Sequence, residues 1–538
     1  MRLRRLRGEH GFTMAPVAIA TSFVSLVVAV AATAVNGDLN LTRNDLDHKQ
    51  AYEAARAGLA DYSFHLNQDT NYWTRCTSVP APSAVNQVGS TANRRPVPGS
   101  SGATYAIELI PRTGQSACST SDPVGTMIET TGLSTGTFRI RSTGYSGDSQ
   151  QSIVATFKRA SFLDYLYFTQ LETSDPVTYG NPATIAGAYV QCTKTIQEGR
   201  YTAPIPGSSP TQNCTRIFFI GGEQIKGPLH TNDALLICAG SPTFGRNAAD
   251  VIEVSSPPQG WYSGPPQGTS GCAGATPNFV GSYITNAPVL TPPPTNGQLK
   301  NIALTGYKFT GQVRITLSGT NMTVTSSAGT STVPIPSNGV VYVANGACSA
   351  SYNPFTTTYP ANSGCGNVYV RGSYSGQLTI AAENDIIIRD DLIRTGNGML
   401  GLIANNFIRV YHPICPDGSP TCTGSAQTSM NNCNGGVNGT TPAFGPSQPN
   451  LQINAAMLAI QHSFIVDHYN CGASLGTLTV NGAIGQKFRG AVGTFGGSNT
   501  GYTKNYNYDD RLRYVSPPHF LDPVESAWHI QRQTLDFP

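Results

Sequence analysis

Apolar and polar residues divide the beginning of the chain into two segments. An uncharged apolar run extends from Phe12 to Val35, and a polar segment rich in helix-favouring residues follows from Asp38 to Gln68. About 20 apolar residues in a helix are enough to cross the hydrocarbon core of a bilayer. The pattern therefore predicts a transmembrane helix over residues 12–36, continued by an amphipathic stalk helix over residues 37–75.

One face of the predicted stalk helix is apolar. Its members follow 3,4,3,4 spacing, which stacks side chains along one side of a helix: Tyr52, Ala55, Leu59, Tyr62 and Leu66. This seam is expected to take part in helix packing during assembly, or to pack on a β domain of the same chain.

The period changes to that of strands after residue 75. Three segments of alternating apolar residues are bounded by Gly, Ser or Pro: Tyr105–Ile110, Phe138–Arg141 and Ser152–Lys158. Alternation of this kind is typical of antiparallel strands. Residues 76–169 are therefore expected to form an antiparallel β unit that covers the apolar face of the stalk helix.

A loose repeat occurs between residues 170 and 500. Leu378–Ile388 aligns with Leu400–Val410 at an offset of 22 residues, and both contain Ala-x-Asn-x-Ile-x-[Ile/Val]. Short strands at this spacing, with Asn or Gly at the corners, predict a right-handed parallel β-helix whose coils bury their inward residues by stacking. Asn384 and Asn406 would form an amide ladder inside it. A β-sandwich built from the same strands is the alternative.

The expected fold class is thus mainly β with a long N-terminal α-helix. The final stretch, residues 501–538, is expected to cap the last coil and to contain a short helix from Val524 to Gln533. Residues 1–11 form a basic leader before the apolar run, and the segment over 170–500 is the head.

Charge is low for the length of the chain. The 538 residues include 33 Lys and Arg against 30 Asp and Glu, for a net charge of +3. The one dense basic cluster is the leader, with Arg2, Arg4, Arg5 and Arg7. A chain with this charge distribution is not expected to bind nucleic acid. Basic residues before an apolar helix stay in the cytoplasm, so the remainder is expected outside the membrane.

The twelve cysteines all lie beyond the apolar run, and no two have CxxC spacing, which disfavours a zinc ribbon or a thioredoxin-like site. An exported, disulfide-bonded chain is expected instead. Pairing of nearest neighbours would close short loops, although spacing alone leaves the connectivity open. In that scheme the pairs are Cys76 with Cys118, Cys192 with Cys214, Cys238 with Cys272, Cys348 with Cys365, Cys415 with Cys422, and Cys433 with Cys471.

The sequence Gly11-Phe12-Thr13, between a basic leader and an apolar helix, resembles the processing site of type IV prepilins. The resemblance implies that a prepilin peptidase cuts between Gly11 and Phe12 and that the helix then packs with other pilins. Most members of the family carry Glu at the fifth mature position, where this chain has Pro16. That departure implies a minor, tip or initiating subunit.

The segment Gln50–Leu59 is similar to the post-membrane helix of PilX-type pilus assembly proteins, which carries an Ala-x-x-Ala-Ala-x-Ala-Gly-Leu pattern. The resemblance covers about the first seventy residues. It implies a single-pass protein of the cytoplasmic membrane, with its N-terminus in the cytoplasm, that reaches the cell surface or pilus after assembly.

The chain is not expected to contain a functional catalytic motif. Two Gly-x-Ser-x-Gly matches, at Ser134 and Ser474, lack the strand and helix of a nucleophile elbow, and no His-Glu-x-x-His motif occurs. No catalytic residue, metal or cofactor is therefore assigned. Parallel β-helices include polysaccharide-degrading enzymes, whose carboxylates and basic residues share one groove. In this chain the candidates for such a groove would be Glu383, Asp385, Arg389, Asp390 and Asp391.

Three functions follow in order of preference. The first is a minor pilus component whose large β head serves display or adhesion, with a surface glycan or protein as ligand. The second is a signal-anchored adhesin or carbohydrate-binding protein outside any filament. The third is a β-helical polysaccharide-degrading enzyme.

Overall fold

The computed structural model has two compact units. The smaller comprises Met1–Glu129, Thr137–Lys158 and Ala527–Pro538, and the larger comprises Thr130–Gly136 and Arg159–Ser526. The structure describes residues 14–69, 71–76, 94–100, 102–129, 137–159, 161–179, 181–238, 240–263, 274–349, 352–355, 357, 359, 363–413, 447–494, 499–513, 515–524 and 528–536, with the side chains of the first helix described over 19–30 and from 42 onward.

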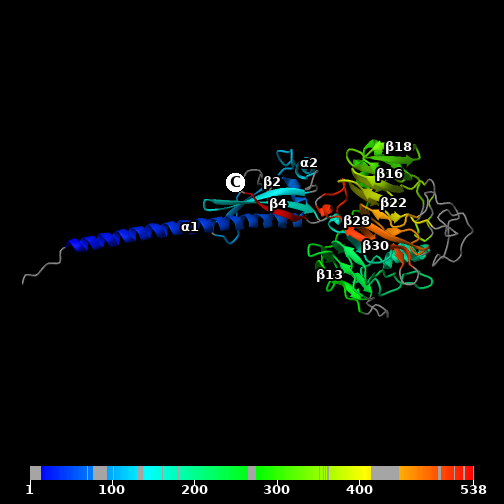
Figure 1. Ribbon diagram of the computed structural model, residues 1–538, viewed down its shortest axis with the longest axis horizontal. Helices are drawn as coiled ribbons and strands as arrows, with labels where there is room; N and C mark the ends of the chain where they lie inside the picture. The colour runs from blue at the N-terminus through cyan, green and yellow to red at the C-terminus, as the bar shows by residue number, and fades with distance from the viewer. Residues whose placement is uncertain are drawn as a thin grey trace, which may run out of the picture. The chain divides into compact units, whose positions relative to one another are not determined.

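In the smaller unit one long helix packs on an antiparallel sheet (Figure 1). The helix is α1 (Met14–Gln68), followed by η1 (Tyr72–Arg75) and, later, the short α2 (Pro123–Met127). The sheet has the order β1-β2-β3-β4-β31 within the described residues. Its strands are β1 (Arg95–Pro96), β2 (Thr104–Ile110), β3 (Thr137–Ser146), β4 (Ser149–Arg159) and β31 (Trp528–Asp536). The three strands predicted from alternating residues are thus confirmed as β2, β3 and β4.

Close approach of α1 to β3 depends on glycine. A Cβ atom added at Gly144 would lie 2.0 Å from the carbonyl oxygen of Ala51, so only glycine lets the strand reach the helix backbone. The hydroxyl of Ser142 donates a 2.8 Å hydrogen bond to the carbonyl oxygen of Ala55 at the same crossing. The aromatic rings of Tyr62 and Phe138 fill the core beside it.

The end of the chain corrects two expectations. Residues 524–533 were expected to be helical, but β31 is a strand that joins β4 in the smaller unit. Trp528 fixes it there by packing edge-on against Phe138, with ring centroids 4.7 Å apart. Residues 501–508 are not a cap either, because they belong to β30 (Thr500–Tyr508), a paired strand of the larger unit. The larger unit is therefore inserted between two adjacent strands of the smaller one.

The larger unit is mainly β and is built on a curled sheet of predominantly parallel strands. One ladder runs, in order of pairing, through β15 (Lys308–Thr310), β19 (Val340–Ala344), β21 (Gln377–Ala382), β23 (Met399–Ala404), β26 (Ala456–Ala459), β28 (Ser474–Phe488), β5 (Tyr167–Leu171), β8 (Leu229–Thr231), β11 (Val251–Val254) and β14 (Ser282–Thr285). Residues 167–169, expected in the first unit, thus begin a strand of the larger one.

A second ladder runs beside the first. It contains β16 (Val313–Gly319), β20 (Val368–Tyr374), β22 (Ile386–Arg394), β24 (Ile408–Val410), β25 (Gln452–Ile453), β27 (Phe464–Val466), β30, β7 (Gln224–Lys226), β10 (Thr243–Phe244) and β13 (Asn278–Phe279). The long strand β28 pairs in both ladders, so the sheet curls there. Figure 1 shows β16, β22, β28 and β13 following one another along the stack.

Shorter elements complete the larger unit. A third group of parallel strands comprises β6 (Phe219–Ile220), β9 (Leu235–Cys238) and β12 (Trp261–Ser263). The antiparallel strands are β17 (Asn321–Ser326) and β18 (Gly329–Pro334), which follow β16, and β29 (Gly493–Thr494), which pairs with β30. The helices are η4 (Phe162–Asp164), η5 (Pro176–Tyr179), α3 (Pro182–Gln191), α4 (Gly297–Ile302), η6 (Thr305–Tyr307) and η7 (Asp510–Arg513).

The repeat found in the sequence corresponds to neighbouring strands. Leu378 pairs with Leu400 and Ile386 with Ile408, so the 22-residue offset is one step along both ladders. The amide of Asn406 donates a 2.6 Å hydrogen bond to Asn384, as the predicted ladder requires. Because the two ladders consist of parallel pairs, they differ from the antiparallel sheets of a β-sandwich.

Chain order and stacking order differ in the larger unit. The first strand, β5, lies between β8 and β28, so it is in the interior of its ladder. After β14 the chain crosses to β15 at the other end through residues 286–307. Asn296 anchors this crossing segment, since its buried amide donates to the carbonyl oxygens of Ala382 (2.8 Å) and Ile403 (3.0 Å).

Disulfides are present in both units. Among the described cysteines, three nearest-neighbour pairs are bonded: Cys76–Cys118, Cys192–Cys214 and Cys348–Cys365. Cys238 and Cys471 are also disulfide-bonded. The remaining four, Cys272, Cys415, Cys422 and Cys433, lie outside the described residues, so the other three expected pairs stay predictions.

Candidate functional site

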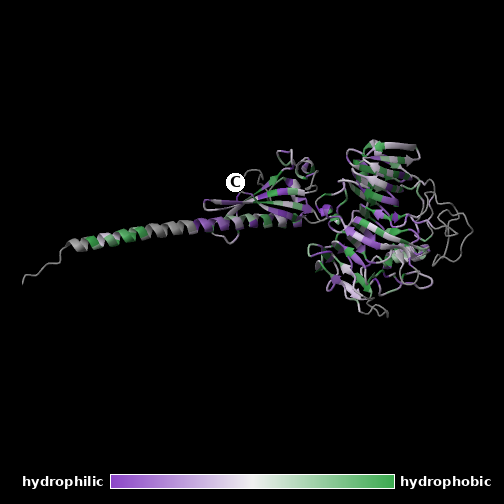
Figure 2. Ribbon diagram, viewed as in Figure 1, coloured by the Kyte–Doolittle hydropathy of each residue, from purple (hydrophilic) through white to green (hydrophobic). Residues whose placement is uncertain are grey.

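The first half of α1 carries an exposed apolar surface. The large apolar side chains between residues 19 and 30 are 52–70% exposed: Ile19, Phe23, Val24, Leu26, Val27, Val28 and Val30. They belong to the apolar end of α1 in Figure 2. They point to several sides of the helix, which is typical of a helix that is buried in another apolar environment. No helix among the described residues combines the length and apolar character needed to cross a membrane.

The residues expected for processing precede this surface in the sequence. Gly11 and Phe12 lie outside the described residues, so their role stays a prediction. Pro16 lies in the first turn of α1 as described. A proline is tolerated there because the first N–H groups of a helix have no partner within the helix.

The predicted apolar seam packs inside the smaller unit. Ala55, Leu59, Tyr62 and Leu66 are buried in its core, whereas Tyr52 is 37% exposed. Four of the five seam residues therefore pack in the core of this chain's own unit, which was the other possibility for an amphipathic helix; Pro16, also expected to take part in assembly, is not among them. The large apolar side chains that stay exposed on α1 lie mainly in its first half.

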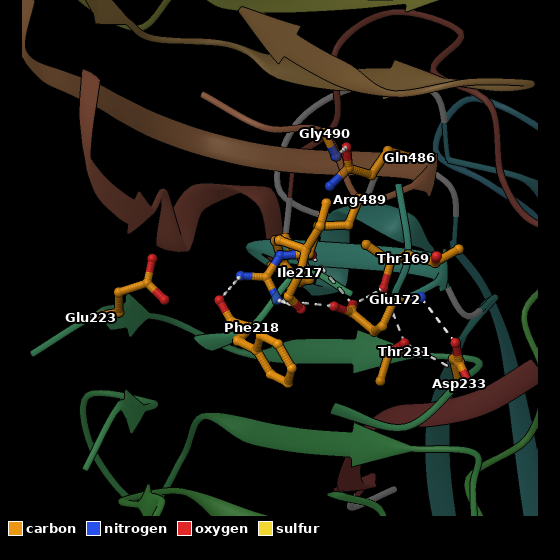
Figure 3. Close-up of polar contacts among 12 residues, drawn as sticks. Thr169, Glu172, Ile217, Phe218, Glu223, Thr231, Asp233, Gln486, Arg489 and Gly490 are labelled. Atoms are coloured by element: carbon orange, nitrogen blue, oxygen red, sulfur yellow. Dashed lines mark hydrogen bonds and ion pairs between the residues drawn. The ribbon is translucent and has the colours of Figure 1, made fainter. Parts of the chain in front are cut away.

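Buried charged groups form a network in the larger unit where β28 meets β5 (Figure 3). The guanidinium of Arg489 donates to Glu172 (3.3 Å) and to the carbonyl oxygens of Ile217 and Phe218 (3.2 Å each). Burial is the main influence on Glu172 and raises the pKa of its carboxyl. Asp233 accepts a 2.9 Å hydrogen bond from the Glu172 amide and forms an ion pair with the fully buried Arg200.

A second buried group surrounds Arg409 of β24. Its guanidinium contacts both oxygens of Asp467 at 3.0 Å and Asp385 at 3.1 Å. The hydroxyls of Tyr352 and Tyr359 each donate a 2.6 Å hydrogen bond to Asp467. The hydrogen bonds to Asp467 therefore tie Tyr352 and Tyr359, which lie between the bonded Cys348 and Cys365, to the group around Arg409.

The charged residues that a polysaccharide-degrading enzyme would need are engaged with different partners. Asp385 is the partner of Arg409, and Glu383 accepts a 2.6 Å hydrogen bond from the Asn345 amide. Arg389, Asp390 and Asp391 lie together at an irregular point of β22. No group of three or more His, Cys, Asp or Glu side chains within the described residues is arranged to hold a metal ion.

Sequence reasoning missed the buried arginines. Arg409 stands between Ile408 and Val410 in a fully buried strand, and Arg489 follows the buried Phe488. A charged residue within an apolar strand must find a partner, because burying an isolated charge is very costly. That signal marks Arg409 and Arg489 as paired, although the sequence does not name the partners.

Comparisons with known proteins find similarity among solved structures. No protein-family model matches the chain, and no curated protein matches it. Among solved structures, it is similar to the crystal structure of the competence-associated pilin ComZ from Thermus thermophilus. The identity is 13% and the TM-score 0.25, and the match covers 91% of this chain and 98% of that chain. The similarity is to a pilin, but at this TM-score it supports no functional assignment by itself.

Proposed function

We propose that this chain is a minor component of a type IV pilus-like filament and that its larger unit is exported for display or adhesion. The observation that carries the proposal is the contrast between the two halves of α1. Its second half packs on the sheet of its own unit, whereas Ile19–Val30 exposes large apolar side chains. Exposed apolar surface of this kind favours transfer into a membrane or a bundle of similar helices.

The N-terminal sequence supports the delivery route. A peptidase that cuts after Gly11 would leave Phe12 as the first residue and keep the apolar helix attached to the exported units. The helix would first anchor the chain in the cytoplasmic membrane and then pack with other pilins. Pro16, in place of the usual Glu, favours a tip or initiating position and a PilX-type role. The disulfides of both units fit an exported protein.

For the larger unit, we infer a right-handed parallel β-helix. Support comes from the in-register parallel pairs between segments 22 residues apart and from the stacked Asn384 and Asn406. An experimental density map in which β21 and β23 are not neighbours would contradict this architecture.

The mature N-terminus tests the proposed delivery. In cells that contain the prepilin peptidase, mass spectrometry of the mature protein is expected to find Phe12 as the first residue. Gly11→Val is expected to abolish cutting, whereas the matched control Gly8→Val, three residues away in the leader, is expected to be processed normally. A mature protein that starts at Met1 or Arg2 would contradict the proposal. So would one that is cut after Ala31 or Ala34, where Ala-x-Ala sequences resemble the cleavage site of an ordinary signal peptide.

A second measurement separates the filament from a simple surface anchor. If the chain is a pilus component, it co-purifies with sheared filaments, and Gly11→Val removes it from that fraction. If it is a signal-anchored adhesin, it stays with the membrane fraction in both cases, and the filament assignment is wrong.

A further inference from the structure

Three arginines lie on neighbouring strands of the larger unit. Arg314 is on β16, Arg371 on β20 and Arg389 on β22, and Figure 1 labels β16 and β22. Their chain neighbours on the inner side of the sheet are all buried: Val313, Ile315, Val370 and Ile388. Since side chains alternate between the two faces of a strand, the three arginines share the outer face.

A bulge in β22 brings additional polar groups to the same place. Val370 pairs with Ile388, but the next pair is Gly372 with Leu392, so Arg371 faces the three residues 389–391. Gly372 has a φ of +107°, and a Cβ atom there would lie 2.3 Å from the carbonyl oxygen of Leu317. Bulges of this kind are frequent where a sheet redirects side chains toward a functional site.

Charged side chains of both signs gather at the bulge, with Arg371 and Arg389 beside Asp390 and Asp391. The guanidinium of Arg371 is 3.9 Å from the carboxylate of Asp390, and the side chains of Arg371 and Asp390 are 42% and 39% exposed. The neighbouring carboxylate of Asp391 accepts a 2.8 Å hydrogen bond from the Gln452 amide. Partial burial, followed by the charge of Arg371, lowers the pKa of Arg389; the carboxylate of Asp390 acts in the opposite direction, and Arg314 acts in the same direction as Arg371. Three arginines (Arg314, Arg371 and Arg389) thus stand against two carboxylates (Asp390 and Asp391), which leaves a net positive charge that a bound anion can neutralise.

We propose that this surface, formed by Arg314, Arg371 and Arg389 with the hydroxyl of Thr316, binds the carboxylate groups of an acidic polysaccharide. Guanidinium groups bind carboxylates through two parallel hydrogen bonds. Adjacent strands lie about 4.8 Å apart, so the cations are spread along the stack and suit a ligand with several separated carboxylates. The Thr316 hydroxyl already accepts a hydrogen bond from Arg371 (3.4 Å) and so lies within the same surface.

Nucleic acid is a poorer fit for the same surface. Proteins that bind a duplex strongly through its backbone neutralise about 6–10 phosphates, and this surface offers three arginines beside Asp390 and Asp391. The net charge of +3 over the whole chain supplies little further attraction. The inference rests on the export of the larger unit in the proposed function, but not on a position in a filament.

Binding of the purified full-length chain to polygalacturonate tests the inference, with neutral galactan as the comparison ligand. Polygalacturonate is expected to bind and galactan is not. Arg371→Gln combined with Arg389→Gln is expected to weaken binding at least tenfold, whereas the exposed Arg532→Gln in the smaller unit leaves it unchanged. Asp390→Asn removes the competing carboxylate and is expected to tighten binding several-fold, which a purely structural role for this bulge would not produce.

Other outcomes overturn the inference. Equal binding of galactan, or unchanged affinity in the double variant, shows that the arginines do not recognise carboxylates. Duplex DNA bound more tightly than polygalacturonate makes the ligand a nucleic acid, and full competition by inorganic phosphate makes it a small anion. Gly11→Val is expected to bind polygalacturonate normally, so failure of this inference is distinguishable from failure of the proposed delivery.

Discussion

Arg489 forms a buried ion pair with Glu172, although 317 residues separate them along the chain. Nη1 of Arg489 lies 3.3 Å from Oε2 of Glu172, and the side chains are 3% and 0% exposed. Glu172 directly follows β5 and Arg489 directly follows β28, and these two strands are neighbours in the ladder. The pair therefore closes the larger unit where a late strand meets the first one.

Removing one partner of this pair is expected to destabilise the larger unit strongly. Arg489→Met leaves Glu172 buried without its cation, which typically costs about 3–5 kcal/mol. The double variant Glu172→Gln, Arg489→Met removes both charges and is expected to recover most of that loss. Urea-induced unfolding of the purified chain measures both, with the exposed Lys308→Met as a control that changes stability by less than about 0.5 kcal/mol. Equal stability of Arg489→Met and the control would contradict a role for the pair.

The crossing segment depends on one asparagine. Asn296 is fully buried, and its side-chain amide donates to two carbonyl oxygens on β21 and β23. Asn296→Ala removes both hydrogen bonds, and each typically contributes about 0.5–1.5 kcal/mol, so we expect a loss of about 1–3 kcal/mol in the free energy of unfolding. Asn301→Ala, on the exposed side of the same segment, is the matched control and is expected to change it by less than about 0.5 kcal/mol. A loss as small in Asn296→Ala as in the control would show that Asn296 does not hold the segment.

The local features of the fold were predictable from the sequence. Strands β2, β3 and β4 follow from alternating residues, and the pairing of Asn384 with Asn406 follows from the 22-residue repeat. A similar ladder, in which Asn481 bonds to Asn454 and Asn507 to Asn481, was not predicted. Those asparagines are 26 or 27 residues apart, so they fall outside the 22-residue repeat.

Long-range relationships were not predictable. A repeat indicates that neighbouring segments stack, but it does not show which two ends meet, so the contact of β28 with β5 was missed. The strand β31 was missed because Trp528–Asp536 acquires its conformation by pairing with a sheet formed more than 350 residues earlier. In the candidate surface, the acidic and basic residues at 389–391 were noted, but only the strand register brings Arg314 and Arg371 to them.

A buried histidine makes stability depend on pH. Nδ1 of His412 lies 3.0 Å from the carbonyl oxygen of Asp467, and burial, followed by the charge of His468, lowers the pKa of His412 to about 4. Between pH 6.5 and 4 the unfolded chain therefore binds a proton that the folded chain does not, so stability falls as the pH falls. The full effect of this one group is about 3 kcal/mol.

Burial raises the pKa of Glu172 and Asp385, so these two carboxyl groups change stability with pH in the opposite direction over part of the range. They are present in both proteins, so comparison of the natural chain with His412→Asn isolates the contribution of His412. Asn keeps a donor near the position of Nδ1 but does not titrate. Unfolding free energies measured at pH 7 and pH 4 are expected to differ more in the natural chain than in His412→Asn, by about 3 kcal/mol. The same pH dependence in both proteins would contradict the lowered pKa.

The contact between Gly144 and Ala51 predicts that the helix and sheet of the smaller unit tolerate no extra methyl group. In Gly144→Ala the new Cβ atom would lie 2.0 Å from the Ala51 carbonyl oxygen and 2.4 Å from the Ala55 nitrogen, so α1 must move away from β3. Overpacking of this kind costs about 1–3 kcal/mol, and more where backbone must shift.

Hydrogen exchange of the purified chain locates that loss. Amides of α1 after residue 50 and of β3 are expected to exchange faster in Gly144→Ala, whereas those of the larger unit keep their protection. Gly306→Ala is the matched control, because no atom lies within 4 Å of its new Cβ and its φ is not positive. If the two variants exchange alike, close approach at Gly144 does not hold α1 to the sheet. If Gly144→Ala alone loosens α1 and also lowers recovery in sheared filaments, then docking of the stalk on its sheet is a condition for assembly.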